Sequence, residues 1–340
     1  MADGQSLALQ SIDSFFIRSG LTVQDRLDCF AFVEELYPDK SISPTSCQGY
    51  CSMTTLVGEH LIVQFRPSKY RLNLLVTSAA RDVYGTFAPE TKYIATLPGS
   101  GLLVYIMDRI RGITFKDLQA SSGTRGISTQ FRARLCRDFA VFLSRSWHRG
   151  AEKPMELGTV GRSIKTRLQS LCKDLPIRFR ATARHILTNL HHIEALPCVL
   201  THGDIVPANI MVNPSTGALT GLVDWAEAEF LPFGICLYGL EELLGKITPG
   251  GFQYSAEAER LRNVFWTELR RNIPALQNIH VLQVVKLARD LGILLWHGIA
   301  FDDGAIDRVV QEGRDIEEIQ RLDSFLDVEI LGQRDHKPKL

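Results

Sequence analysis

The spacing of hydrophobic residues changes along the chain, and each change predicts a different kind of element. Between residues 11 and 37, apolar side chains recur every three or four positions, which is the period of helices that pack through one face. Pro38 ends this pattern, because proline cannot continue a helix. Antiparallel strands are predicted from short apolar runs bounded by turn residues, at 46–57, 60–66, 91–96 and 102–107. A helix is predicted between the two pairs of strands, at about 72–87.

The rest of the chain, from about residue 112, shows mainly the helical period. Helices are predicted over residues 131–148, 179–196, 252–271, 280–297 and 306–326. The exception is the stretch 198–229, which combines apolar strand-like runs with a polar loop and a short hairpin. The predicted fold class is therefore α+β and bilobal. It has an N-terminal helical segment (1–40), a small lobe of antiparallel sheet and helix (41–111), a larger, mainly helical lobe (112–330) and a tail (331–340).

Composition sets outer bounds on the function. With 340 residues, 45% of them hydrophobic, the chain can bury a core large enough for two lobes. Its 38 basic and 38 acidic residues give a formal charge of zero, so the charge balance favours neither nucleic acid nor a membrane surface as a partner. Residues 1–10 lack the basic and apolar parts of a secretory signal, and the apolar run at 291–301 is too short to span a bilayer. The residues do not specify an oligomeric state.

Cysteine usage bears on the compartment. The seven cysteines are scattered without a C-x-x-C pair, and an odd number cannot all pair within one chain. This usage is typical of a reducing environment, so a cytoplasmic location is predicted. The last three residues, Pro338-Lys339-Leu340, are similar to the S-K-L peroxisomal address except for the proline, which leaves a peroxisomal location as the alternative.

Polar residues with the spacing of a phosphoryl-transfer site lie in the 198–229 stretch. His202-Gly203-Asp204 is followed by Asn209 and, after the hairpin, by Asp224. Phosphoryl transfer needs a carboxylate beside the attacking hydroxyl and oxygen ligands that hold magnesium against the phosphates. Asp204 suits the first role. Asn209 and Asp224 supply a neutral and an anionic oxygen, which suits a cation that takes only one or two protein carboxylates. The hairpin is expected to bring these two residues back to the same end.

These motifs resemble those of a known family. The segments 201–212 (THGDIVPANIMV) and 221–225 (GLVDW) are similar to the two signature segments of the aminoglycoside phosphotransferase family, which are small-molecule kinases with a protein-kinase-like fold. The resemblance implies that ATP and Mg²⁺ are the cofactors and that a small-molecule hydroxyl is the acceptor. It also implies that Asp204 is the catalytic residue, that His202 supports the loop, and that Asn209 and Asp224 are magnesium ligands.

The N-terminal lobe departs from the family pattern. Gln64 stands where the resemblance implies a cationic residue for the nucleotide phosphates, and Arg66 follows two residues later on the same face of the strand. Arg66 is therefore the candidate for that role. The predicted helix at 72–87 contains no glutamate to support such a cation. The alternative function is therefore a pseudokinase-like binding or scaffold protein whose lobe no longer binds ATP in the usual manner.

Other nucleotide contacts are implied by position. Gly49 stands in the place of a turn that covers phosphates, although one glycine is a weak signal. Met107, Asp108 and Ile110 lie in the segment that resembles the family's hinge, whose backbone usually meets the adenine.

The residues after Trp225 also depart from the pattern. Cys236 stands where the family has an aspartate. Glu227 and Glu229 are close enough in sequence to Asp224 to add negative charge near a metal or a cationic substrate, but they suit solvated loop positions equally well.

Overall fold

The chain folds into two compact units. The computed structural model describes residues 2–45, 48–123, 126–149, 158–302 and 305–326. The first unit comprises Met1–Arg111 and Gly221–Ala226, and the second comprises Gly112–Thr220 and Glu227–Leu340. The predicted tail at 331–340, with its peroxisome-like ending, lies outside the described residues. Within the described residues, no helix is both long enough and apolar enough to cross a membrane.

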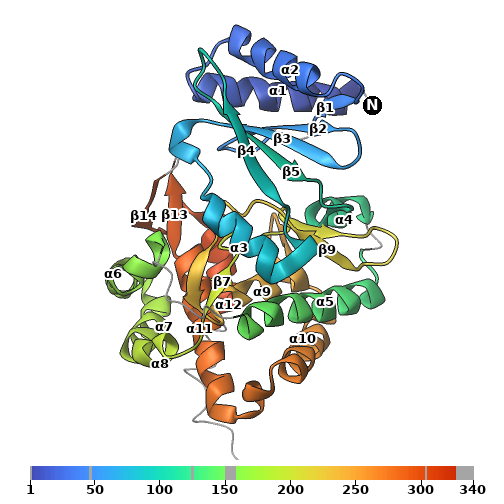
Figure 1. Cartoon of the computed structure of the whole chain (residues 1–340). Helices are drawn as coiled ribbons and strands as arrows, with labels where there is room; N and C mark the ends of the chain where they lie inside the picture. The colour runs from blue at the N-terminus through green and yellow to red at the C-terminus, as the bar shows by residue number, and fades with distance from the viewer. Residues whose placement is uncertain (1, 46–47, 124–125, 150–157, 303–304, 327–340) are drawn as a thin grey trace, which may run out of the picture. The chain divides into compact units, whose positions relative to one another are not determined.

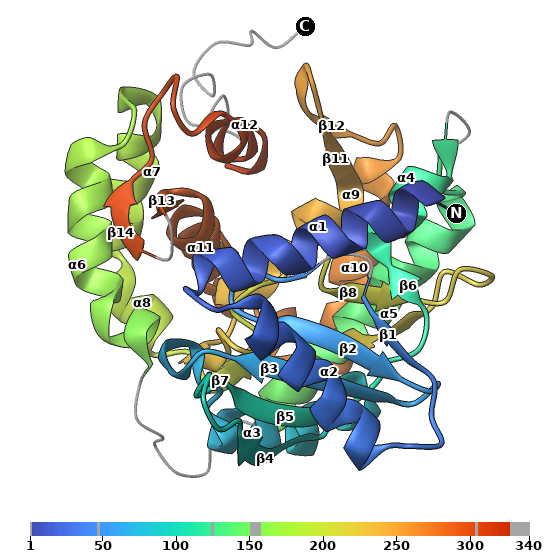
Figure 2. The same cartoon turned by 90° about the horizontal axis from the view of Figure 1, so that it is seen from above.

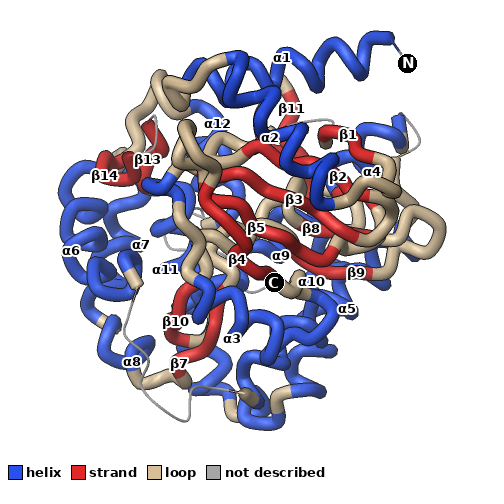
Figure 3. The backbone as a smooth tube through the Cα atoms, turned by 45° about the horizontal axis from the view of Figure 1, so that its top comes forward, coloured by secondary structure: helices blue, strands red, loops and turns tan. Residues whose placement is uncertain are grey.

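A five-stranded antiparallel sheet forms the centre of the first unit (Figures 1 and 3). Its strands, in spatial order, are β1 (Ile42–Pro44), β2 (Met53–Val57), β3 (Leu61–Arg66), β5 (Leu103–Asp108) and β4 (Thr91–Thr96).

The strand predicted at 46–57 begins only at Met53, so the prediction is wrong for residues 48–52, and residues 46–47 lie outside the described part of the chain. The reason lies in Gln48, whose side-chain amide donates to the Thr54 carbonyl at 3.2 Å and to Thr45 Oγ1 at 3.1 Å. The Gln48 side-chain oxygen also accepts the Thr54 N–H. A side chain thus takes the hydrogen bonds that a continuing strand would have made.

Two helices cover one face of this sheet. In Figure 2, α2 (Val23–Leu36) crosses in front of the sheet, and α1 (Ala2–Arg18) runs beside it. Their shared core contains buried residues from both helices and from three strands: Ile12, Phe15, Phe16, Cys29, Val33, Met53, Val57, Val63, Phe65 and Val104. Thr22 begins α2 with a reciprocal capping box to Asp25, which satisfies backbone N–H groups that the helix leaves free.

The opposite face of the sheet carries two of the predicted nucleotide-binding side chains, Arg66 and Met107. Side chains alternate along a strand, so Val63 and Phe65 face α1 and α2 while Arg66 turns the other way. The register pairs Arg66 with Leu103, and Leu103 belongs to a second, smaller cluster on that face. α3 (Leu74–Tyr84) contacts β4, and Asn73 caps its first turn.

The second unit is mainly helical. Its helices are α4 (Phe115–Ser121), α5 (Thr129–His148), α6 (Thr159–Asp174), α7 (Ile177–Thr188), α8 (Leu190–Glu194), α9 (Gly239–Leu244), α10 (Ala258–Asn272), α11 (Ile279–His297) and α12 (Ile316–Phe325). α5 packs along α10, where the rings of Phe139 and Phe265 lie 6.0 Å apart. α11 is the central helix, because it contacts α6, α7, α8 and α12.

Small sheets complete this unit. β7 (Cys198–Thr201) pairs antiparallel with β10 (Glu229–Pro232). Two hairpins follow, β11 (Gly245–Thr248) with β12 (Gly251–Tyr254) and β13 (Ile299–Asp302) with β14 (Ala305–Val309). A three-stranded sheet has the order β6 (Ile113–Thr114), β8 (Ile210–Val212) and β9 (Leu219–Leu222). The predicted hairpin in the 198–229 stretch is therefore confirmed.

Three predicted helices differ from the structure. Residues 252–254 belong to β12 and 305–309 to β14, so the helices predicted at 252–271 and 306–326 are wrong at their starts. The helix predicted at 179–196 is divided at Asn189, whose side-chain amide donates to the His185 carbonyl at 2.9 Å. α7 therefore ends at Thr188, and α8 begins at Leu190. The α+β class itself is confirmed.

Candidate active site

The loop that carries the predicted catalytic residues starts from the β7–β10 pair. Thr201, the last residue of β7, pairs with Glu229, and its hydroxyl donates to the Glu229 carbonyl at 2.9 Å. His202 follows directly and is buried, with 2% of its surface exposed. The loop therefore leaves the strand from a fixed point.

The structure brings three predicted residues of this loop together. The Asp204 backbone N–H donates to His202 Nδ1 at 3.2 Å, so His202 supports the loop through its own ring. The Asn209 amide nitrogen donates to the Asp204 carboxylate at 2.9 Å and to the Asp204 carbonyl at 3.0 Å. Because the nitrogen of Asn209 is turned toward Asp204, the amide oxygen points away from it.

Gly203 makes this turn sterically possible. Its φ of 78° is in the left-handed region, which favours glycine. A Cβ at this position would lie 2.0 Å from the Glu227 carbonyl oxygen, so the chain after Trp225 packs directly on the loop backbone at this point. Glycine is required here both for its conformation and for the close approach.

Ile205 continues the loop into the core of the second unit. Its N–H donates to the Tyr238 hydroxyl at 2.8 Å. Burial, followed by the nearby Asp204 carboxylate, raises the pKa of the Tyr238 phenol well above its usual value, so the phenol stays neutral. Sequence reasoning missed this contact, since no motif links residues 33 positions apart.

Asp224 belongs to the first unit and has an unusual backbone. Its φ of 61° is the one positive φ among the non-glycine residues that the structure describes. Such a conformation costs on the order of 1–3 kcal/mol and tends to occur at functional sites. The next residue anchors it, because Trp225 donates its indole N–H to the Leu222 carbonyl at 2.9 Å and packs on Tyr84 with ring centroids 5.1 Å apart.

Arg66 is buried in the first unit, on the face of the sheet opposite α1 and α2. Its Nε donates to the Tyr70 carbonyl at 2.8 Å, and its Nη1 donates to Gln64 Oε1 at 2.8 Å. Gln64 in turn donates to Thr54 Oγ1 at 3.2 Å. Gln64 and Arg66 therefore lie on one face of the strand, as predicted. The two acceptors of Arg66, the Tyr70 carbonyl and the Gln64 side-chain oxygen, are uncharged, so they fix the position of the guanidinium without cancelling its charge.

The hinge-like segment is tied to its own unit through the backbone. The N–H of Asp108 donates to the Glu90 carbonyl at 3.1 Å, and the N–H of Arg109 donates to the His60 carbonyl at 2.8 Å. The Asp108 carboxylate also lies 3.5 Å from an Arg81 nitrogen. An adenine bound at this segment would therefore have to use other backbone groups.

The remaining predicted nucleotide contacts are also in the first unit. Met107 is half-buried on the same face as Arg66, paired with Ile62, and Ile110 is buried. Gly49 is exposed, has no positive φ, and has room for a Cβ, which would meet Ser52 Oγ at 3.4 Å. Backbone freedom is therefore not the reason for a glycine at this position.

Glu229 neither adds charge near a metal or substrate nor lies in a solvated loop, the two roles that its sequence position suggested. It is buried, and its carboxylate accepts the N–H groups of Val160 at 3.0 Å and Gly161 at 2.9 Å, in the first turn of α6. It therefore caps a helix through charge-assisted hydrogen bonds.

Burial raises the pKa of the Cys236 thiol to about 12, so this residue is a packed, unreactive thiol.

A metal ion here would have to be held by few protein groups. Among the residues that the structure describes, no three His, Cys, Asp or Glu side chains gather as a metal site. Magnesium fits this chemistry, because it binds through one or two carboxylates together with neutral oxygens, waters and substrate phosphates. The amide oxygen of Asn209 and the carboxylate of Asp224 are donors of the right type.

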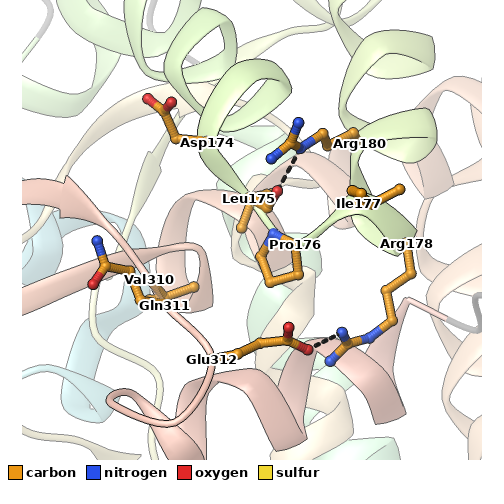
Figure 4. A pocket seen from close by; sticks show the side chains of 9 residues that line it. All are labelled: Asp174, Leu175, Pro176, Ile177, Arg178, Arg180, Val310, Gln311 and Glu312. Carbon is orange, nitrogen blue, oxygen red and sulfur yellow. Dashed lines mark hydrogen bonds and ion pairs between the residues drawn. The ribbon is translucent and has the colours of Figure 1, made fainter.

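A pocket of about 620 Å³ lies elsewhere, on the surface of the second unit (Figure 4). It is lined at the start of α7 and by the segment before α12, and none of the predicted site residues is among its lining. Arg178 pairs there with Glu312, and Arg180 donates to the Leu175 carbonyl (Figure 4). The pocket therefore takes no part in the candidate site.

Comparisons with known proteins agree with the motifs. Residues 79–234 match the model of the phosphotransferase enzyme family. The chain is similar to the GDP complex of wild-type aminoglycoside 2'-phosphotransferase-IIIa, with 14% identity, 80% of this chain and 90% of that chain covered, and a TM-score of 0.52. The GDP complex of a point mutant of that enzyme gives 14% identity, coverage of 80% and 89%, and a TM-score of 0.53. No curated protein sequence matches the chain. The predicted family resemblance and kinase-like fold class are thereby confirmed.

Proposed function

We propose, from the premise that residues 79–234 belong to the phosphotransferase enzyme family, that this protein transfers the terminal phosphoryl group of ATP to a hydroxyl of a small molecule with the help of Mg²⁺. The observation that carries the proposal is the contact between Asn209 and Asp204. It holds a carboxylate in place for an acceptor hydroxyl and turns an amide oxygen outward for a cation.

Each residue of the catalytic loop then has a separate role. Asp204 orients the acceptor hydroxyl and takes up its proton as the bond to phosphorus forms. His202 holds the loop through the Asp204 N–H. Asn209 and Asp224 would hold magnesium, which neutralises charge on the phosphates when it is bound. Asn209 belongs to the second unit and Asp224 to the first, and their pairing as ligands comes from the family resemblance.

The nucleotide is assigned to the first unit. Arg66 steadies the phosphates, and Met107, Asp108 and Ile110 line the adenine, with Gly49 as the turn near the phosphates. The buried, preorganised guanidinium of Arg66 supports its part, since its two neutral partners leave its charge available. The similar solved structures contain GDP, so the nucleotide assay should include GTP beside ATP.

The second candidate is a pseudokinase-like binding or scaffold protein. It is favoured by Gln64, which occupies the expected cation position and holds Arg66 by a hydrogen bond. In that case the catalytic loop would keep its shape without turning over ATP.

One experiment separates the two. A metabolite extract incubated with the protein, ATP and Mg²⁺ is screened by mass for gain of one phosphoryl group, and turnover of the acceptor found is measured for Asp204→Asn. We expect a loss on the order of a thousandfold, because this change removes the charge and keeps the shape. The rise in Tm with ATP and Mg²⁺ should be retained, since the variant still binds the nucleotide.

Asp174→Asn is the matched control, because Asp174 is an exposed aspartate at the end of α6. It should keep full turnover. Full activity of Asp204→Asn on a verified acceptor would remove Asp204 from its role. Absence of any rise in Tm at millimolar ATP with Mg²⁺ would favour the scaffold.

A further inference from the structure

We infer that Tyr238 and Gly239 form a seat for Ile205, and that this seat is a positioning device for the neighbouring Asp204. The inference rests on the proposed function, since it assumes that Asp204 meets the acceptor. Tyr238 ends the short 3₁₀ turn Ile235–Tyr238, and Gly239 begins α9, so the seat lies more than thirty residues beyond the catalytic loop in sequence.

The first half of the seat is a hydrogen bond. Tyr238 Oη accepts the N–H of Ile205 at 2.8 Å. Both residues are buried, Ile205 fully and Tyr238 with 3% of its surface exposed. A buried backbone N–H that loses its acceptor carries the full cost of its desolvation, so this bond fixes the peptide plane between Asp204 and Ile205.

The second half of the seat is Gly239, which has no side chain to separate its backbone from Ile205. A Cβ on Gly239 would lie 2.3 Å from Ile205 Cγ2 and 2.8 Å from Ile205 Cβ. The Ile205 side chain therefore rests directly against the Gly239 backbone. Tyr238 thus binds the backbone N–H of Ile205, and the next residue, Gly239, contacts its side chain.

The seat is itself fixed on α11. A Cβ on Gly292 of this helix would lie 1.8 Å from the Ile235 carbonyl oxygen, so helix and turn meet backbone to backbone. At Gly234, just before the turn, a Cβ would lie 2.9 Å from the Val285 carbonyl oxygen of α11, so backbone meets backbone there as well. The Tyr238 ring also stacks on Trp296, with centroids 5.5 Å apart and an angle of 12° between the planes.

The consequence concerns the Asp204 carboxylate. The Asp204 N–H is held by His202, and the peptide group between Asp204 and Ile205 is held by Asn209 at its carbonyl and by Tyr238 at its N–H, so the main chain of Asp204 is fixed at both ends. A displacement of about 1 Å at such a group can cost on the order of a hundredfold in rate. The central helix of the second unit thereby determines where the catalytic carboxylate lies.

The test uses Tyr238→Phe, which removes only the acceptor oxygen. We expect kcat to fall at least about tenfold while KM for ATP stays unchanged, because nucleotide binding is assigned to other residues. Tyr254→Phe is the matched control, since the Tyr254 hydroxyl also bonds inside the second unit, to Glu241 and to the Ser324 carbonyl, without touching the loop. It should keep its kcat. Gly239→Ala should act in the same direction as Tyr238→Phe.

A second readout does not need activity. Amide hydrogen exchange of the peptide that contains Ile205 should be faster in Tyr238→Phe than in the wild type, and unchanged in Tyr254→Phe. Equal losses of kcat in the two tyrosine variants, or unchanged kcat in Tyr238→Phe, would overturn the inference. If the wild type phosphorylates no acceptor, the proposed function has failed, and the exchange measurement alone decides whether the seat exists.

Discussion

Two residues of the predicted site hold backbone conformations that most side chains avoid. Gly203 has a φ of 78° and Asp224 a φ of 61°. For glycine this conformation costs little, whereas for Asp224 it costs free energy that the packing of Trp225 on Tyr84 helps to offset. Strain of this kind at a predicted ligand supports a functional rather than a structural reason for the aspartate.

Gly203 allows the close approach of the loop to be tested. Gly203→Ala should lower the free energy of unfolding by well over 1 kcal/mol and abolish most turnover, because its Cβ would lie 2.0 Å from the Glu227 carbonyl oxygen. Chemical denaturation and kcat measure the two effects. Gly313→Ala is the control, since Gly313 has the same φ of 78° with open space around its Cβ. Equal losses of stability in both variants would show that the close approach is unimportant.

The sequence predicted the neighbours of Asp204 better than the partners of the loop as a whole. His202, Gly203, Asp204 and Asn209 lie within eight residues, so a short loop was bound to bring them together, and it does. Tyr238 could not be found in this way. Its contact with Ile205 depends on how α11 packs on the 3₁₀ turn, and that packing leaves no local pattern in the sequence.

Among the elements, α6 depends on a residue that is far away in the sequence. Its N-cap, Gly158, has no side chain to accept the free N–H groups of the first turn, and the Glu229 carboxylate accepts two of them. A Cβ on Gly158 would lie 2.5 Å from Glu229 Oε2, so the glycine also makes room for this cap. β10 is thereby joined to α6 by a buried anion.

Removal of this cap should be measurable. Glu229→Ala should lower the free energy of unfolding by about 1–2 kcal/mol, because two N–H groups lose their acceptor. Glu229→Gln should lose less, since one side-chain oxygen remains. Urea denaturation measures both, with Glu34→Ala as the control at an exposed position inside α2. A loss for Glu229→Ala no larger than that of the control would contradict the capping role.

Helices with a long, uniform period agree well with the sequence prediction, whereas the hairpins β11–β12 and β13–β14 were not predicted. α5 covers 129–148 against a prediction of 131–148, and α11 covers 279–297 against 280–297. The window 306–326 predicts a helix over β14 because it also contains α12, whose helical period is stronger. Its strand character comes from pairing with β13, which a local window does not register.

For the whole molecule, the main surprise is the path of the chain between the units. Residues 221–226 belong to the first unit, although the residues before and after them belong to the second. Asp224 therefore belongs to a different unit from Asp204 and Asn209. Periodicity could not have assigned this segment, because its membership depends on long-range contacts such as that of Trp225 with Tyr84.

The second unit also contains buried ion pairs that no sequence motif predicted. Glu241 bonds to Arg262 at 2.8 Å, and Glu242 bonds to Arg321 at 2.8 Å. Both glutamates are almost completely buried. Loss of one partner of such a pair is costly, since the other charge stays buried.

His297 makes the stability of this unit depend on pH. Burial, and then the nearby Arg321, lower the pKa of His297 well below its usual value, so the folded protein holds it neutral. The unfolded chain takes up the proton below about pH 6.5, and the free energy of unfolding should then fall by up to about 1.4 kcal/mol per pH unit. Glu242, 3.9 Å from His297 Nε2, acts in the opposite direction, because burial raises its pKa and its stabilising effect is lost as the pH rises.

The effect of His297 can be isolated by comparing variants at each pH. Denaturation with guanidinium between about pH 8 and pH 5 should show a smaller loss of stability for His297→Gln than for the wild type, since the variant has no proton to take up on unfolding. The contribution of Glu242 is largely shared by the two proteins. His280→Gln, at an exposed position in the first turn of the same helix, should keep the slope of the wild type. Parallel curves for His297→Gln and the wild type would show that the buried imidazole does not stay neutral on folding.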